Sequence, residues 1–256
     1  MSFPNIIYAS GDGLTHRQNE STVKNRRMGQ IMLYEDGRQW RFVENGGVAL
    51  VSDDLIQGPA RIAADFTDIV VDAAAAAAAT SVSVTPTTTT AANTYGDARS
   101  VEAYGYMLVN KAAAAAAAAG VYRVKSHVVF AASAGIIITL QDPLHVALAI
   151  NDEVGFIKNP YTDVVQAVAT TITNRIVGVA QNVITIDYFG WLQTKGIAAV
   201  NSAASQIVGN RLVAIVASAG RAGVEAETSG VPQYLGEALT VPTTAGEFGG
   251  IFLCID

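Results

Sequence analysis

Residues 177–199 read VGVAQNVITIDYFGWLQTKGIAA, and this stretch decides the fold class. Hydrophobicity alternates from Val183 to Tyr188, and β-branched and aromatic residues dominate the stretch. Successive side chains of a strand point to opposite faces, so the alternation predicts antiparallel β-structure. A helix would need apolar residues three and four apart, and Gly190 and Gly196 would each cost it about 1 kcal/mol.

A hairpin is the clearest local structure outside that stretch. Ile31–Tyr34 predicts one strand, Asp36-Gly37 is a favoured two-residue turn, and Gln39–Val43 predicts the antiparallel partner. Further strand-like segments recur at intervals of about ten residues, as in sandwiches and barrels. They are residues 48–51, 68–71, 81–85, 104–109, 121–125, 136–140, 146–149, 206–216 (two strands around a Gly-Asn turn), 234–241 and 248–255. We therefore expect an all-β protein.

Two alanine runs, residues 73–79 and 112–119, interrupt the β pattern. Alanine is the best helix former, yet runs this short do not make a stable isolated helix. Three interpretations stay open: short helices that cap sheet ends, loops of small residues between strands, or alanines that stand in place of undetermined side chains.

The composition favours extensive packing against neighbours over solution chemistry. Charged residues make up 15% of the 256 residues, against about 25% in ordinary soluble proteins. The net charge of −6 does not suggest a partner among nucleic acids. The N-terminus lacks the pattern of a cleavable signal, and the longest apolar run, residues 130–140, is too short to span a membrane. We expect synthesis in a cytoplasm and no membrane partner.

No catalytic residue, cofactor-binding residue or metal ligand is predicted. His16, His127 and His145 are far apart and have no ligand at metal spacing. Phosphate-binding glycine loops and nucleophile elbows are missing from the sequence. The carboxylate pairs Asp53-Asp54 and Asp152-Glu153 are adjacent, so on a strand they would point to opposite faces, and we expect solvated turn charges. The single cysteine, Cys254, excludes an internal disulfide.

Two features are candidate interfaces. A local basic cluster lies in the first thirty residues and is either a solvated loop or an arm that lies on an acidic surface of another subunit. Its members are His16, Arg17, Lys24, Arg26 and Arg27. Trp191 is the second candidate, because an exposed indole at this position, or at Trp40, would offer a stacking platform; the alternative for Trp40 is a core anchor.

With these residues in view, the chain resembles the capsid decoration (cement) and related head proteins of tailed bacteriophages, especially those of marine phages. The resemblance is strongest at residues 176–180 (IVGVA) and 187–196 (DYFGWLQTKG). It extends to Gly29-Gln30-Ile31, Asp36-Gly37, Trp40-Arg41-Phe42, Gly209-Asn210, Ala219-Gly220-Arg221 and Gly236-Glu237-Ala238. These motifs punctuate a fold and carry no chemistry, so there are no catalytic residues to transfer.

The resemblance implies a virion structural protein that binds the outer surface of a capsid and stabilises the shell. The expected partners are the major capsid protein and copies of the chain itself, often as trimers. We expect a small β-barrel or sandwich formed by residues 1–60 and 171–256, with a β-rich insert at residues 61–170. Alternatives are a tail or head-fibre adhesion protein, or a carbohydrate-binding β-sandwich.

Overall fold

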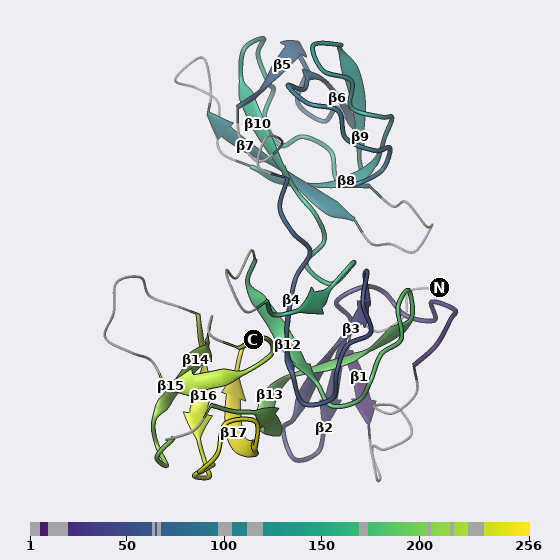
Figure 1. Ribbon diagram of the computed structural model, residues 1–256. Coiled ribbons are helices and arrows are strands. Elements are labelled where there is room, and N and C mark those ends of the chain that lie inside the picture. Colours follow the sequence, from purple (N-terminus) through teal and green to yellow (C-terminus); the bar gives the residue numbers. More distant parts are fainter. Residues whose placement is uncertain are drawn as a thin grey trace. The chain divides into compact units, whose positions relative to one another are not determined.

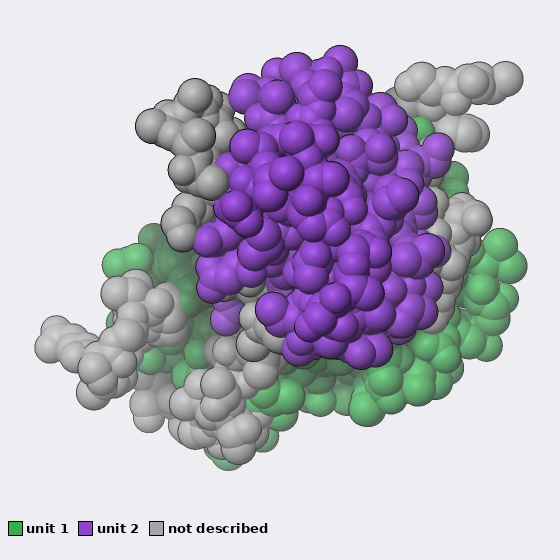
Figure 2. Space-filling model, turned by 90° about the horizontal axis from the view of Figure 1, so that it is seen from above, with its two compact units in different colours: residues 1–60, 160–256 green, residues 61–159 purple. Residues whose placement is uncertain are grey.

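The computed structural model describes residues 6–9, 20–62, 65, 68–96, 104–111, 120–168, 174–203, 206–215, 218–224 and 233–256. Every named element is a β-strand, from β1 to β17, which confirms the all-β prediction (Figure 1). The chain forms two compact units: unit 1 contains residues 1–60 and 160–256, and unit 2 contains residues 61–159 (Figure 2). The second unit is thus inserted into the first along the chain.

Strand β13 (Phe189–Asn201) is the centre of unit 1 and begins within residues 177–199, which were predicted as β-structure. The alternating residues before it, Val183–Tyr188, do not form a strand, because Ile184 makes a single bridge with Leu50 and residues 186–187 form a turn. The first half of β13 pairs antiparallel with β3 (Gln39–Glu44) and its second half with β17 (Phe248–Cys254). Lys195 is the one residue of β13 that pairs with both strands, which lie on opposite sides of β13. A register shift precedes Lys195, and Gly196 has φ of +85°, so the backbone bends where β3 and β17 separate.

The remaining strands of unit 1 extend this sheet on both sides. Its main path runs β1-β2-β3-β13-β17-β16-β14-β15, and β4, β11 and β12 form a side branch on β13. Strand β1 pairs parallel with β2, whereas the other pairs are antiparallel. The bounds of these strands are Ile6–Ala9 (β1), Ile31–Tyr34 (β2), Leu55–Gln57 (β4), Val165–Gln166 (β11), Ile176–Ala180 (β12), Arg211–Ala214 (β14), Ala222–Val224 (β15) and Tyr234–Ala238 (β16).

The burial of β13 changes along its length. Residues 189–194 are all buried, whereas residues 195–201 alternate between exposed and buried positions. Leu192 in the first half packs in a cluster with Val43 and Ile56, and Val200 in the second half packs with Leu212. The second half of β13 is therefore ordinary one-sided sheet, with one face in the core and the other open to a partner.

Unit 2 is a closed six-stranded barrel with the strand order β10-β5-β6-β9-β8-β7. Alternate side chains fill its interior, including Val82, Met107, Val124, Ile138 and Phe156. Closure leaves these strands without the unpaired edges that an open sheet exposes. The bounds are Ile69–Ala73 (β5), Ser81–Thr85 (β6), Gly105–Lys111 (β7), Val121–His127 (β8), Ile136–Leu140 (β9) and Glu153–Ile157 (β10).

The all-β, barrel-type architecture is as predicted, and the closed six-stranded barrel is the inserted unit. The chain ends instead form the branched eleven-stranded sheet. The predicted insert, residues 61–170, also extends too far along the chain. Pro160 begins the second part of unit 1, because β11 pairs with β4 and Val164 forms a bridge with Asn45. Pairing partners this distant in sequence leave no local signal.

Some predicted strands also differ. Residues 48–51 and 146–149 form single bridges only, at Leu50 and Leu148, and residues 206–210 form a turn that leads into β14. The sequence did not predict β1, β4, β10, β11 or β15. Strand β4 is buried at all three residues and so shows no alternation. The first alanine run is not a helix: Ala73 ends β5, Ala75 bridges Leu148, and Ala78 has φ of +68°. The second run, residues 112–119, lies outside the described residues.

Candidate interaction surface

A row of side chains crosses the open face of the unit 1 sheet. The strand registers pair Tyr8 with Leu33, Leu33 with Gln39, Gln39 with Lys195, and Lys195 with Cys254. Residues paired across adjacent strands place their side chains on the same face. All five are exposed or partly exposed, so the row runs over β1, β2, β3, β13 and β17 on a surface open to a partner.

A second row lies two residues further along β13. Ile197 pairs with Phe252 of β17, and Phe252 pairs with Glu237 of β16, which pairs with Arg211 of β14. Ile197 is 62% exposed and Phe252 is 43% exposed. Apolar side chains therefore occupy the centre of this face and a carboxylate and a guanidinium lie at its side.

We name the exposed part of β13 and β17 the β13–β17 face, defined by Lys195, Ile197, Ala199, Phe248, Phe252 and Cys254. Gly250 lies between Phe248 and Phe252 on the same side of β17, since alternate residues of a strand share a face. Phe248 is 62% exposed and pairs with Asn201 at the end of β13. The face joins large apolar side chains on two adjacent antiparallel strands, which is a rigid platform.

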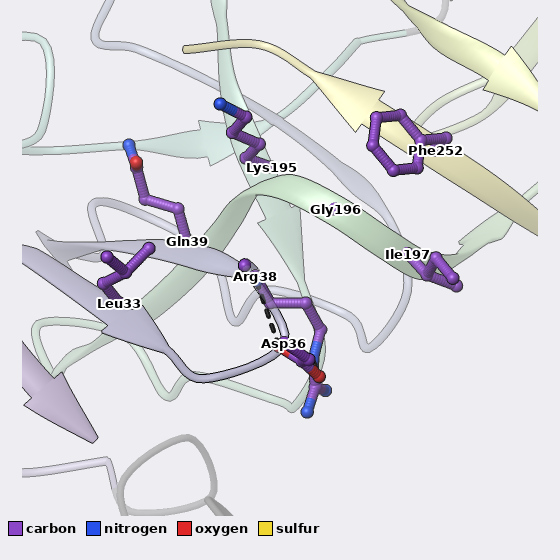
Figure 3. Close-up of a pocket in the computed structure, with 9 residues that line it drawn as sticks. Leu33, Asp36, Arg38, Gln39, Lys195, Gly196, Ile197 and Phe252 are labelled. Carbon is purple, nitrogen blue, oxygen red and sulfur yellow. Dashed lines mark hydrogen bonds and ion pairs between the residues drawn. The ribbon is translucent and has the colours of Figure 1, made fainter. Parts of the chain in front are cut away.

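A shallow hollow lies where β3 and β17 separate on β13 (Figure 3). Its lining joins Leu33 and the turn at Asp36–Arg38 on one side to Ile197 and Phe252 on the other, with Gly196 between them. A Cβ at Gly196 would come within 3.1 Å of the Arg38 Cα atom, so glycine permits this close approach. The hollow is therefore a product of the bend in β13.

The charged side chains around the hollow leave a net positive charge. The Arg38 Nε–H donates to Asp36 Oδ2 at 2.6 Å, so these two charges offset each other. Burial acts to raise the pKa of Asp36, but hydrogen bonds from the backbone and side chain of Arg38 outweigh burial and lower that pKa. Lys195 also lines the hollow, and its exposed ammonium group makes no hydrogen bond or ion pair to any residue in the described ranges. The hollow thus presents a positive charge beside apolar side chains.

The basic residues predicted as an interface lie only partly within the described residues. His16 and Arg17 lie outside the described residues. Arg26 and Arg27 are exposed in the loop before β2, and Lys24 is half-buried. The basic cluster therefore stays a prediction, with three of its members on a described loop.

Trp191 is not a surface residue, which corrects its place among the candidates. Its side chain is 7% exposed, and its ring lies edge-on to Phe42 with 5.1 Å between centroids. Phe42 in turn stacks on Phe189 at 6.0 Å. Trp40 is fully buried and lies 6.1 Å from Tyr34. Both indoles are core anchors, and neither presents a ring face on which a sugar could stack.

Carboxylates expected in solvated turns are buried instead. Asp54 is 2% exposed; its Oδ1 accepts a hydrogen bond from the Asn201 amide at 2.8 Å, and its Oδ2 accepts one from Gln166. Burial raises the pKa of Asp54, against the lowering effect of these hydrogen bonds. Asp152 is fully buried and accepts a backbone N–H at 2.8 Å. The amide partners of Asp54 come from distant segments, so no local pattern could have revealed this role.

Unit 2 contains a buried polar cluster that the sequence analysis missed. Asp65 is fully buried and accepts hydrogen bonds from the hydroxyl groups of Thr88, Thr90 and Tyr95 at 3.0, 2.5 and 2.7 Å. The Tyr95 backbone N–H donates to His127 Nε2 at 3.1 Å, while His127 Nδ1 lies 2.7 Å from a backbone carbonyl oxygen. A ring with one acceptor and one donor nitrogen is neutral, and burial lowers the pKa of His127. These groups satisfy one another's hydrogen bonds, so we assign them a structural role in the barrel.

Within the described ranges, no group of three or more His, Cys, Asp or Glu side chains is arranged to hold a metal ion. A search of the same residues for a helix long and apolar enough to cross a membrane finds none. No protein-family model matches this chain, and no curated protein sequence matches it significantly.

Proposed function

We propose that this protein is a structural component of a tailed-bacteriophage virion, which binds the outer surface of the capsid and stabilises the shell. The resemblance of its glycine-punctuated strands to decoration proteins motivates the proposal. The observation that carries it is the β13–β17 face, because its apolar side chains are exposed and unit 1 does not bury them. The proposed partners are the major capsid protein and further copies of the chain, as a trimer.

The chemistry of the β13–β17 face fits a protein contact. Contiguous exposed apolar side chains on a soluble protein mark interaction sites, and protein interfaces place apolar residues at the centre and charges at the rim. Ile197, Phe248 and Phe252 form such a centre, while Lys195 and Glu237 lie beside it. Burying these three side chains against a shell supplies the hydrophobic part of the binding free energy.

Capsid stabilisation follows from mass action. A protein that binds the assembled shell and not its separated subunits stabilises the assembled state in proportion to RT ln(1 + [L]/Kd). Repetition of one modest contact over every lattice position makes the total effect on the particle large. No turnover chemistry is required, so this function needs only a rigid surface of the right shape.

The experiment measures binding of the purified protein to expanded, undecorated capsids by co-sedimentation. Ile197→Asp places a charge in the centre of the β13–β17 face and is expected to weaken binding by at least about tenfold. Ile137→Asp is the matched control, because Ile137 of unit 2 is also 62% exposed. Equal binding by Ile197→Asp and the wild-type protein would exclude the β13–β17 face as the contact, and no binding by the wild-type protein would exclude decoration.

One competing location in the virion is the tail or a head fibre. Copy number distinguishes the two: decoration requires the chain at most lattice positions, whereas a tail or fibre protein is present in few copies. The carbohydrate-binding alternative loses its proposed platform, since Trp40 and Trp191 are both buried.

A further inference from the structure

We infer that strand β1 is exchanged between copies, so that Ile6–Ala9 of one copy completes the β2 edge of a second copy. This inference concerns contacts between copies and does not depend on capsid binding. The occupant of the edge is already defined, because the same segment is seated on β2 within the chain. Strand exchange of identical elements between protomers is an accessible route to association.

Strand β1 adds little to the core of unit 1. Tyr8 is 76% exposed, Ile6 is 37% exposed and Ile7 is half-buried. By contrast, Met32 and Tyr34 of the neighbouring strand β2 are 0% and 6% exposed. The backbone ladder with β2 is therefore the main attachment of β1, and a strand with few buried apolar contacts detaches at low cost in free energy.

The edge of β2 offers a specific register for this segment. Strand β1 pairs with β2 in a parallel register that joins Ile6 to Ile31 and Tyr8 to Leu33. Without β1, this side of β2 would be an unpaired edge of the sheet, and such an edge is a template for another strand. Every copy carries the same β1 sequence, so the register is equally satisfied by a strand from the same chain or from another.

The chain after β1 is attached to the rest of unit 1 only from Glu20 onward among the described residues. Glu20 Oε1 accepts a hydrogen bond from the Thr185 hydroxyl group at 2.8 Å, and Ser21 forms a bridge with Phe189 at the start of β13. Ten residues, 10–19, separate this anchor from β1. Ten residues reach at most about 35 Å, which suffices to place β1 on an adjacent molecule.

The experiment mixes two single-cysteine variants of the full chain, both with Cys254→Ser. One carries Tyr8→Cys and a mass tag, and the other carries Leu33→Cys without the tag. These positions are register partners, and each chain holds only one of them, so a disulfide between them forms only across two copies. Non-reducing electrophoresis after mild oxidation at high protein concentration measures the tagged–untagged dimer.

The matched control replaces the Leu33→Cys chain with an Ile137→Cys chain, whose exposed position in unit 2 reports random collision. Exchange predicts at least about a tenfold excess of the Tyr8–Leu33 disulfide over the Tyr8–Ile137 disulfide, because pairing raises the effective concentration of the two thiols. Equal yields of the two disulfides would overturn the inference. The result is independent of any capsid, so exchange and decoration are tested separately.

Discussion

Ile197 of β13 lies directly opposite Phe252 of β17, and both side chains face solvent, 62% and 43% exposed. On the opposite side of the same strands, Ala198 and Ile251 are register partners and are buried. One side of β13 and β17 therefore packs in the core, and the other side carries apolar residues that the fold does not bury.

This arrangement predicts that the Ile197–Phe252 pair contributes little to stability. Replacing both residues with Ser is expected to lower the free energy of unfolding by about 1 kcal/mol or less, since a cross-strand pair is worth about 0.2–1 kcal/mol. Urea unfolding of the purified protein measures the change. A loss of more than about 3 kcal/mol would show that the pair belongs to the core, and it would remove the argument that these residues await a partner.

Gly196 is predicted to be necessary for the bend in β13. Gly196→Ala meets both a positive φ of +85° and the backbone of Arg38, whereas Gly209→Ala meets the same φ with no atom within 4 Å. An L-residue in this region costs about 1–2 kcal/mol. We expect Gly209→Ala to show that cost alone and Gly196→Ala to be more destabilising by at least about 1 kcal/mol. Equal losses in thermal or urea unfolding would contradict the close approach of Arg38.

Buried Asp54 is predicted to contribute more to the free energy of unfolding than an exposed ion pair does. Asp54→Ala leaves the partly buried amides of Asn201 and Gln166 without this acceptor, and a hydrogen bond to a charged group contributes about 1.5–3 kcal/mol. The contrasting variant is Asp142→Ala, which removes the surface pair with Arg123 and should cost about 1 kcal/mol or less. Chemical unfolding distinguishes the two variants. Comparable losses would contradict the structural role of Asp54.

His127 predicts an acid-sensitive stability of unit 2. Burial lowers its pKa in the folded protein below the ordinary value of 6.5, so the unfolded chain binds the proton more readily. The contribution of neutral His127 to the free energy of unfolding is therefore fully present above pH 6.5 and is lost as the pH falls below that value. Asp65 and Tyr95 are the other titratable groups around this ring; the nearby Asp65 carboxylate opposes the effect of burial.

The measurement is the midpoint of thermal unfolding between pH 7.5 and pH 5 for the wild-type protein and for His127→Gln. The wild-type midpoint is expected to fall more steeply over this range than that of the variant. His145→Gln is the control, because His145 is exposed and should leave the wild-type slope unchanged. Parallel slopes for the wild-type protein and His127→Gln would contradict the prediction.

The sequence was informative where local pattern and burial coincide. The hairpin of β2 and β3 follows its prediction to within one residue, because Asp36-Gly37 supplies turn chemistry and Met32 and Trp40 alternate with more exposed neighbours. The prediction of β-structure over residues 177–199 covers most of β13, but the alternation that supported it, from Val183 to Tyr188, belongs to a turn with a single bridge at Ile184. The first half of β13 is buried on both faces, so the interior position of Trp191 could not be read from alternation.

The features that the sequence did not predict depend on pairings between distant segments. Strand β4 consists of three buried residues whose partners, β11 and β12, lie more than a hundred residues away. The candidate surface was missed for a related reason: Ile197 and Phe252 are each unremarkable in sequence and become a site only when β13 and β17 pair. Which unit closes into a barrel likewise depends on the β10–β5 pairing, which joins the ends of the insert.

The most direct test of the proposed function is a reconstruction of the virion by cryo-electron microscopy with this chain placed in the density. The proposal predicts density for unit 1 at most positions of the outer capsid lattice, with Ile197 and Phe252 directed toward the major capsid protein. Density confined to the tail or to a single vertex, or a lattice contact made on the opposite side with both residues open to solvent, would contradict it.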